Sequence, residues 1–255
     1  MLKPRIIPSL LIQDGGLVKT TKFGSPRYIG DPINAVKIFN EKEADELTVL
    51  DIDASSNHCE PDYRLIERLA NECRMPLCYG GGIKTLEQAN RILSFGVEKI
   101  IVSSLFIENP DMISRMAAYL GNQSVVIAFD LKKVMFSKKY EFCIHNGNKK
   151  TGKYWEELIP KAIELGAGEI LINCIDRDGM MEGYDLELLT NIYSHCTVPM
   201  TVLGGAGSIE HLREAISQLG IVGVAAGSLF IYKGIHKAVL INYPDRENKH
   251  RLYSF

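Results

Sequence analysis

The 255-residue chain lacks a long apolar run and an excess of charge of either sign. No stretch approaches the roughly 20 apolar residues of a membrane-spanning helix, so the sequence predicts no membrane segment. The formal net charge is −2 at pH 7, which favours neither nucleic acid nor an acidic membrane surface as a partner. With 46% hydrophobic and 24% charged residues, the composition excludes disorder, collagen and coiled coil.

The sequence also lacks a cysteine or histidine pattern that would bind a metal. None of its six cysteines forms a CxxC pair, and the six histidines are equally scattered. We therefore expect no metal, no cofactor and no disulfide framework, and we interpret the cysteines as thiols of a cytoplasmic protein. The first 16 residues contain an apolar stretch that Pro8 interrupts, without a small-residue cleavage site, so they predict a first strand and not a signal peptide.

Short apolar runs alternate with amphipathic stretches along the whole chain. Each run is nearly continuous in apolar residues, which is typical of parallel strands buried on both faces. The eight runs are residues 5–10, 47–52, 76–79, 99–103, 124–129, 169–174, 200–203 and 222–226. Helices are expected between them over residues 32–42, 63–71, 85–95, 110–119, 155–165, 186–193 and 209–218, several with start signals at Asp31-Pro32, Asn109-Pro110 and Ser208. The pattern predicts one α/β domain over residues 1–255, a (β/α)8 or TIM barrel.

The sequence repeats itself internally. Gly80-Gly81-Gly82 precedes Ser104-Leu105-Phe106-Ile107 just as Gly204-Gly205-Ala206-Gly207 precedes Ser228-Leu229-Phe230-Ile231, each by 24 residues and with the halves 124 apart. A second echo relates Ala44-Asp45-Glu46-Leu47 to Ala167-Gly168-Glu169-Ile170 at an offset of 123. Two half-barrels fused head to tail would explain the two nearly equal offsets.

Two connections carry lysines and lack a helix pattern. Residues 132–153 are expected to form a loop or hairpin, either a solvated basic segment or a mobile lid over an anionic ligand. Residues 16–30 are expected to form a long loop that carries Lys19 and Lys22 after the first strand. In a barrel such a loop lies on the C-terminal face, where active sites of this fold are found.

The two glycine clusters are candidate phosphate sites. Each follows a strand and opens a helix, where glycines let backbone N–H groups approach an anion. Tight turns with positive φ also need glycine and are the structural alternative. Two clusters at matched places in the repeat favour phosphate binding and a two-ended, bisphosphorylated substrate. The candidate phosphate-binding residues are Gly80, Gly81, Gly82, Ser103, Ser104, Gly204, Gly205, Gly227 and Ser228.

Carboxylates at the C-terminal ends of strands are candidate acids and bases. They are Asp51, Asp53, Asp130, Asp176 and Asp178. Asp130 ends the apolar run VVIAFD and is expected at the barrel mouth, with a role in loop hydrogen bonding as its alternative. Asp176 lies in the segment IDRDG, where Arg177 is a candidate partner and the Asp-Gly pair suggests a turn.

A further group of charged residues lies at the opposite ends of the strands. Arg5 opens the first strand, whereas Glu46, Lys99 and Glu169 open the second, fourth and sixth. With a regular register, two cations and two anions would point inward and close a ring of salt bridges across the barrel axis. Such a ring on the N-terminal face is normally a stability feature, and the alternative is a gate at the end of a channel.

These segments resemble the cyclase (HisF-type) subunit of imidazole glycerol phosphate synthase. The similar segments are RIIPSLLIQDGGLVK, ADELTVLDIDAS, YGGGI, VEKIIVSSLFIENP, VVIAFD, GAGEILINCIDRDG and LGGAG. The resemblance implies a barrel with two phosphate sites that docks a separate glutaminase subunit on its N-terminal face. Ammonia would pass through the barrel to a phosphorylated ribulosyl intermediate, giving imidazole glycerol phosphate and a carboxamide ribonucleotide. The resemblance makes Arg5, Glu46, Lys99 and Glu169 the ammonia gate, and Lys19 and Asp130 catalytic residues. Asp176 is a third catalytic candidate because of its place at a strand end.

The chain departs from the family at a catalytic position. A second catalytic aspartate belongs where this sequence has Leu11, and the internal repeat agrees, because IIPSLLI (residues 6–12) aligned with VVIAFDL (residues 125–131) sets Leu11 opposite Asp130. Ser103 replaces a common asparagine at a phosphate site, and the tail after Ile231 lacks a clear final amphipathic helix.

Three functions stay open from the sequence. The first is a paralogue that, with its glutaminase, supplies ammonia to a sugar amidotransferase in surface-polysaccharide (lipopolysaccharide) synthesis of acetamidino sugars. The second is a cyclase of histidine biosynthesis that tolerates Leu11. The third is a non-catalytic activator of its glutaminase partner.

Overall fold

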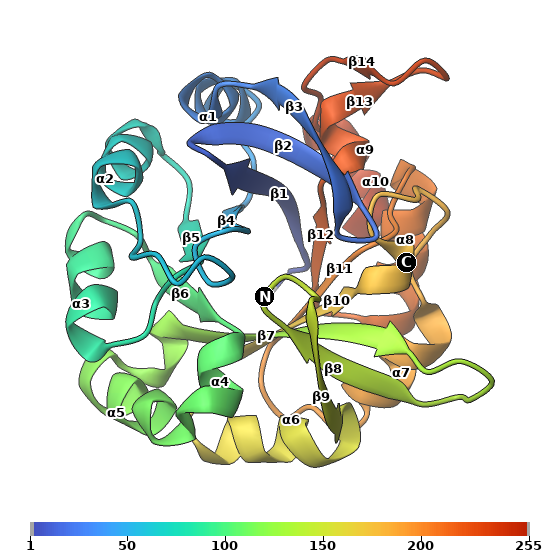
Figure 1. Cartoon of the computed structure of the whole chain (residues 1–255). Helices are drawn as coiled ribbons and strands as arrows, with labels where there is room; N and C mark the ends of the chain where they lie inside the picture. Colours follow the sequence, from blue (N-terminus) through green and yellow to red (C-terminus); the bar gives the residue numbers. More distant parts are fainter. Residues whose placement is uncertain (1–2, 254–255) are drawn as a thin grey trace.

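The eight apolar runs pair in parallel and close into a barrel (Figure 1). A computed structural model describes residues 3–253, and it confirms the predicted (β/α)8 fold. Because β10 pairs with both β7 and β11, the sheet closes on itself. The barrel strands are β1 (Arg5–Gln13), β4 (Leu47–Asp51), β5 (Leu77–Gly80), β6 (Lys99–Val102), β7 (Val125–Lys133), β10 (Glu169–Cys174), β11 (Met200–Leu203) and β12 (Gly223–Ala226).

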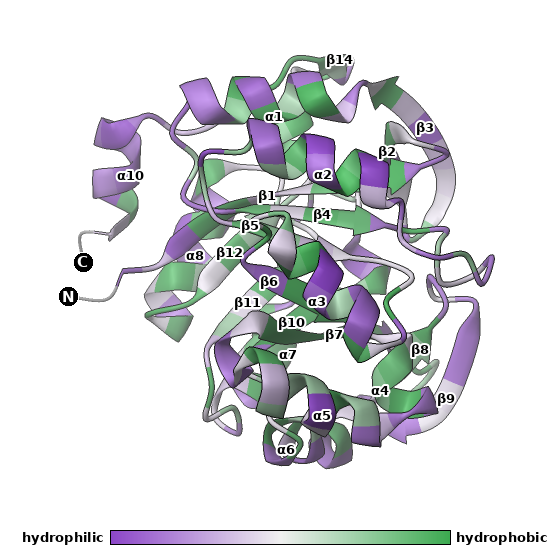
Figure 2. Ribbon diagram, turned by 90° about the vertical axis from the view of Figure 1, so that its left-hand side faces the viewer, coloured by the Kyte–Doolittle hydropathy of each residue, from purple (hydrophilic) through white to green (hydrophobic). Residues whose placement is uncertain are grey.

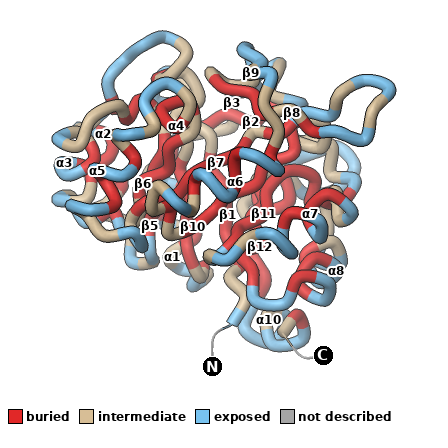
Figure 3. The backbone as a smooth tube through the Cα atoms, turned by 90° about the horizontal axis from the view of Figure 1, so that it is seen from below, coloured by how far each residue is buried: buried red, intermediate tan, exposed pale blue. Residues whose placement is uncertain are grey.

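Amphipathic helices surround the barrel and shield its outer face, as the buried strands and exposed outer helix faces of Figure 3 show. The long ones are α1 (Pro32–Glu41), α2 (Tyr63–Glu72), α3 (Leu86–Ser94), α5 (Pro110–Leu120), α6 (Trp155–Glu164), α7 (Leu186–Tyr193) and α8 (Ile209–Leu219). Asp31 and Ser208 accept backbone N–H groups at the starts of α1 and α8, as their start signals predict. Asn109 makes no such bond, and Pro110 alone marks the start of α5. Within residues 3–253, no helix is long and apolar enough to span a bilayer.

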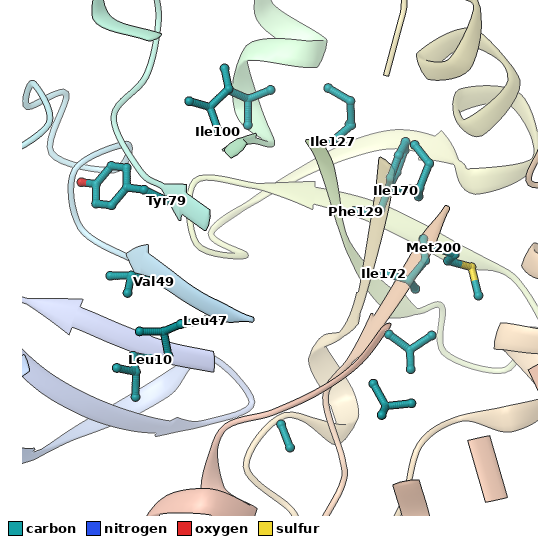
Figure 4. Close-up of a cluster of buried hydrophobic side chains, with 14 of the residues drawn as sticks. Leu10, Leu47, Val49, Tyr79, Ile100, Ile127, Phe129, Ile170, Ile172 and Met200 are labelled. Carbon is teal, nitrogen blue, oxygen red and sulfur yellow. The ribbon is translucent and has the colours of Figure 1, made fainter. Parts of the chain in front are cut away.

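The apolar side chains form two separate clusters. Strand residues that point outward pack against the helices, and Figure 4 labels several of them, including Ile127, Phe129, Ile170 and Ile172. Residues that alternate with these fill the barrel interior, where Ile7, Cys78, Ile101, Val126, Ala128, Leu171, Leu203 and Ala225 pack together. The continuous apolar runs of the sequence therefore serve both faces of each strand.

Each half of the barrel carries a hairpin on its C-terminal face. β1 continues into β2 (Gly16–Thr21) and β3 (Gly24–Gly30), and β7 continues into β8 (Tyr140–Ile144) and β9 (Lys149–Tyr154). The expectation of a loop over residues 16–30 is wrong, because the backbone there pairs with the extended end of β1 and buries Leu17 and Val18. The hairpin alternative for residues 132–153 is confirmed. The equivalent hairpins supply structural support for the half-barrel repeat.

The chain after the last barrel strand is ordered by contacts and not by an apolar helix face. Short elements follow β12, namely α9 (Ser228–Ile231), β13 (Tyr232–Lys233) and β14 (Ala238–Val239), and the short α4 (Ser104–Glu108) is the counterpart of α9. A final helix, α10 (Arg246–Tyr253), does form, and Figure 2 shows it as largely hydrophilic. Lys249 and Tyr253 bind the Asp45 carboxylate at 2.8 and 3.0 Å, while Leu252 is buried.

Tyr243 ties this tail to the start of the barrel, and we expect Tyr243→Phe to destabilise the fold by about 1–3 kcal/mol. Its hydroxyl accepts the Asp45 N–H at 3.0 Å and donates to the Ile6 carbonyl oxygen at 2.9 Å, so its loss leaves one partly buried and one buried backbone group without this partner. Urea denaturation measures the effect. Tyr119→Phe is the matched control, because that ring is 67% exposed, and an equal loss in both variants would contradict the assignment.

Candidate active site

A cavity opens at the C-terminal ends of the barrel strands, and it brings together all the candidate phosphate-binding residues and two of the three catalytic candidates. Lys19, Asp130 and all nine candidate phosphate-binding residues line it, and Leu11 lines it as well. Apolar residues of the strands, among them Leu50, Ile101 and Leu171, form its floor. The cavity therefore has polar walls above an apolar barrel interior.

The two glycine clusters face this one cavity from opposite halves of the repeat. Gly81 and Gly82 have φ of +123° and +72°, and Gly204 and Gly205 have φ of +92° and +117°, so these turns do need glycine. A Cβ on Gly81 would lie 2.5 Å from the Asp51 carbonyl oxygen. The same glycines therefore both form tight turns that need positive φ and line the cavity.

Four buried side-chain atoms around the cavity have no hydrogen-bond partner in the described part of the chain. They are Ser9 Oγ, Ser103 Oγ, Asn173 Oδ1 and His145 Nδ1, and all four residues line the cavity. Buried polar atoms are normally paired, and each unpaired one carries a desolvation penalty. Their convergence indicates that the cavity is built for a polar ligand.

Asp130 lies at the end of β7, opposite Asn173 of β10. Desolvation by the surrounding protein raises the pKa of Asp130 to about 7, although the Asn173 amide, which donates to its carboxylate at 3.3 Å, acts in the opposite direction. A carboxyl group with this pKa is half protonated near neutral pH. It can therefore both give and take a proton there.

Leu11 occupies the matching position in the other half. Leu11 pairs with Leu50 of β4 and Val18 of β2, just as Asp130 pairs with Asn173 of β10 and Cys143 of β8. The register therefore agrees with the repeat alignment that sets Leu11 opposite Asp130. The site holds a carboxyl group on one side and an isobutyl group on the other.

Lys19 is buried at the base of the β2–β3 hairpin. Its Nζ donates to the Ser9 carbonyl oxygen at 2.7 Å, and a Cβ on Gly227 would collide with it. Burial lowers the pKa of Lys19 to about 8, and the Asp178 carboxylate opposes that shift. The ammonium group thus sits beside one of the two candidate phosphate clusters.

The structure does not bring Asp176 to this cavity. Its carboxylate accepts the backbone N–H of Lys133 at 2.7 Å at the outer edge of the β7–β8 hairpin. The neighbouring Asp178 lines the cavity instead, where it accepts the Thr20 hydroxyl at 2.9 Å. Burial raises the pKa of Asp178. Asp176 lies within the short 3-10 turn Ile175–Arg177 and Asp178 directly follows it, and spacing alone did not reveal which of the two carboxylates points inward.

The four charged residues at the other end of the barrel do close a ring. Arg5 contacts Glu46 and also Glu169, the latter at 2.7 Å, and Lys99 contacts the same two carboxylates at 3.2 and 2.9 Å. The side chains of Glu46 and Glu169 are only 5% and 6% exposed. Burial opposes the charge on Arg5 and on Lys99, but the carboxylates outweigh it and raise the pKa of both groups.

Two neutral side chains complete this ring. Cys78 donates to Glu46 at 3.0 Å, and Thr201 donates to Glu169 at 2.5 Å. Burial raises the pKa of the Cys78 thiol well above its usual value, and the Glu46 carboxylate acts in the same direction. Each carboxylate therefore has two cations and one neutral donor, which compensates its desolvation.

The model of the family described as histidine biosynthesis protein matches residues 5–237 of this chain. The chain belongs to this family. Among curated family members, a Leptospira interrogans protein named "Putative imidazole glycerol phosphate synthase subunit HisF" is 74% identical over 99% of this chain and 100% of its own length. The Vibrio vulnificus subunit hisF3 is 55% identical over 98% and 96%, and the Streptomyces coelicolor subunit HisF is 39% identical over 90% of each chain. The chain is thus a HisF-type subunit of the histidine biosynthesis protein family.

Three residues that line the cavity were not predicted as site residues from the sequence. Asn173 lies inside an apolar strand, and His145 lies in a segment that its lysines make look like a solvated loop. Ser9 is an ordinary small residue of the first strand. The internal repeat could have pointed to His145, because the two hairpins follow equivalent strands, β1 and β7, on the side of the barrel where the cavity opens.

Proposed function

We propose that this chain is the synthase subunit of a glutamine-dependent enzyme that carries ammonia and acts outside histidine biosynthesis. A separate glutaminase docks on the N-terminal face, and ammonia passes through the barrel to the cavity, where a two-ended phosphorylated molecule is bound. The ammonia serves a sugar amidotransferase of surface-polysaccharide synthesis that makes acetamidino groups. One observation carries the departure from the histidine pathway, namely Leu11 in the cavity opposite Asp130.

The arrangement along the barrel axis supports the ammonia route. The ring of Arg5, Glu46, Lys99 and Glu169 closes the N-terminal end, and above it the interior is lined by apolar residues. Neutral ammonia enters such an interior at a far lower desolvation cost than ammonium does. A charged ring below an apolar interior can therefore act as a gate that passes the neutral molecule when its salt bridges part.

Leu11 argues against the ring-closing reaction of a cyclase. That reaction uses two proton-transfer groups, and each such group typically contributes about 10²–10⁴-fold to the rate. A leucine side chain transfers no proton, so the side of the cavity that Leu11 lines lacks its acid or base. The numbered names of the Vibrio vulnificus subunit hisF3 and the Pseudomonas aeruginosa subunit hisF2, which is 49% identical, also support a paralogue.

The second candidate function is that of a cyclase in histidine biosynthesis. The pKa values of Asp130 and Lys19, the two proton-transfer groups that remain in the cavity, favour it. Asp130 and Lys19 have pKa values of about 7 and about 8, close to the pH at which a cyclase would work. A single well-tuned acid and a lysine would then perform the chemistry without a second carboxylate. Both candidates share the glutaminase partner and the phosphorylated ligand.

A direct assay separates the two candidates. The purified chain is mixed with ammonium salt and the phosphoribulosyl intermediate, and imidazole glycerol phosphate is measured. We expect turnover at least about 10²-fold below that of a HisF subunit carrying both carboxylates, because one proton-transfer group is missing. Equal turnover would overturn the paralogue assignment and establish the cyclase.

Phosphate binding is expected to fail at one end of the cavity in each of two variants. Gly81→Val forces a side chain against Asp51 at a φ of +123°, and Ser228→Glu adds a negative charge to the other cluster. Calorimetric titration with inorganic phosphate should show two sites in the wild-type chain and one in each variant. Two unchanged sites in both variants would refute the phosphate assignment.

The affinity of the Lys19 end for phosphate is expected to fall as the pH rises through about 8. Lys19 is cationic below its pKa of about 8 and neutral above it, so its charge-assisted bond to the anion is lost there, with about a tenfold weakening. In Lys19→Arg the loss should vanish up to pH 10, because a guanidinium stays charged. The measurement is a phosphate titration at pH 7 and pH 9, and identical pH dependence in both proteins would contradict it.

A further inference from the structure

His145 lies at the tip of the β8–β9 hairpin, in the left-handed backbone region that residues other than glycine adopt infrequently. His145 and Asn146 both have φ of +53°, and Gly147 follows at +74°. Positive φ at residues other than glycine is uncommon and persists where the surrounding structure imposes it, often at functional sites. The backbone N–H of His145 donates to Ser104 Oγ at 3.1 Å, which fixes the tip against one phosphate cluster.

The two edges of the His145 ring have different surroundings. Nε2 lies 2.8 Å from the Glu108 carboxylate, whose side chain is 41% exposed. Nδ1 is fully buried and has no hydrogen-bond partner in the described part of the chain. The ring of His58 packs edge-on against His145 with centroids 5.9 Å apart. The ring is therefore held at its Nε2 edge, whereas its Nδ1 edge has no protein partner in the described part of the chain, and His145 lines the cavity.

The repeat relates this hairpin to the one that carries Lys19. Val18 of β2 pairs with Leu11, and Cys143 of β8 pairs with Asp130, so Val18 and Cys143 are equivalent positions. Lys19 is then equivalent to Ile144, which is the residue next to His145. Lys19 sits beside Gly227 of one cluster, whereas His145 is bonded to Ser104 of the other. Each half-barrel thus sets one protonatable side chain of its hairpin beside a different end of the cavity.

We propose that His145 binds the phosphate at the Ser103–Ser104 end through Nδ1–H, with Glu108 as its positioning residue. This deepens the proposed function, on whose two-ended phosphorylated ligand it rests. When Nε2 donates to Glu108 and Nδ1 donates to the ligand, the ring is an imidazolium between two anions, and both of its bonds are charge-assisted. The ligand also gives Ser103 Oγ, the other unpartnered atom of this end, an anionic oxygen to which it can donate. The ligand is then held by Lys19 at one end and His145 at the other.

The test isolates the Ser103–Ser104 end with inorganic phosphate as the probe. In the Ser228→Glu background, the remaining phosphate site of the full chain is titrated by calorimetry. His145→Ala is expected to weaken it about tenfold or more, the loss of a charged hydrogen bond. His145→Asn retains an amide N–H near the position of Nδ1 and should recover most of the affinity, whereas His145→Gln, which mimics Nε2, should not. Glu108→Gln should cause a smaller loss.

A spectroscopic readout separates binding from a merely structural role. In ¹⁵N-histidine-labelled protein, saturating phosphate should shift the Nδ1 resonance of His145, and melting curves of each variant confirm folding. If His145→Ala and His145→Gln bind within twofold of the parent, or if Nδ1 stays unshifted while phosphate binds, the role of His145 is overturned. If Gly81→Val and Ser228→Glu themselves leave two normal sites, the proposed phosphate function fails instead, which is a distinguishable result.

Discussion

Leu11→Asp is expected to raise the cyclase turnover of this chain by about 10²–10⁴-fold over its own wild-type level. The variant restores a carboxyl group at the position equivalent to Asp130, on a strand whose register already matches that of β7. Leu11 is only partly buried and lines the cavity, so the new side chain can reach the ligand and water. The remaining groups, Asp130 and Lys19, are in place to act with it.

The assay uses ammonium salt and the phosphoribulosyl intermediate, so that no glutaminase is needed. Leu11→Asn is the matched control, because it has the same shape as the aspartate variant and cannot transfer a proton, and it should stay at the wild-type level. Equal gains in both variants would indicate a packing effect and not acid–base catalysis. If Leu11→Asp gains nothing although phosphate binds normally, the cavity has diverged beyond this one residue.

The barrel strands and most helices could be predicted because local pattern and tertiary environment agree there. A strand such as Glu169–Cys174, buried on both faces, has a continuous apolar centre (residues 170–172), and this is visible without a structure. The β2–β3 hairpin was missed because its pattern is misleading. Lys19 and Thr20 are both buried, yet a lysine and a threonine in sequence suggest an exposed segment. Both side chains are buried by tertiary contacts, because Lys19 donates to the Ser9 carbonyl oxygen and Thr20 donates to the Asp178 carboxylate.

The charged ring was predictable for the same reason as the strands, whereas the directions of the Asp176 and Asp178 side chains were not. Arg5, Lys99 and Glu169 lie at strand starts, where the period of two fixes which side chains point inward. Asp176 and Asp178 lie beyond the strand, in a turn whose backbone sets their direction. No period applies in such a turn, so only the structure separates the carboxylate that binds Lys133 from the one that faces Thr20.

Lys99→Met is expected to destabilise the fold by about 3–5 kcal/mol, the usual cost of removing one partner from a buried ion pair. The methionine fills similar space, so the effect comes from the charge. Glu46 and Glu169, both almost fully buried, would then share one cation in place of two. Urea denaturation measures the loss. Lys37→Met is the control, because its pair with Glu72 spans 3.8 Å at the surface and should contribute less than about 1 kcal/mol.

The same variant tests the gate in the complex with its glutaminase. With the ring broken, ammonia should escape at the interface, so glutamine hydrolysis continues while the amount of aminated product per glutamate falls. Ammonium salt supplied from outside should restore product formation, because the cavity on the opposite face is unchanged. Arg5→Ala should behave alike, since it too leaves two carboxylates with one cation. A product-to-glutamate ratio equal to wild type in both variants would leave the ring as a stability feature only.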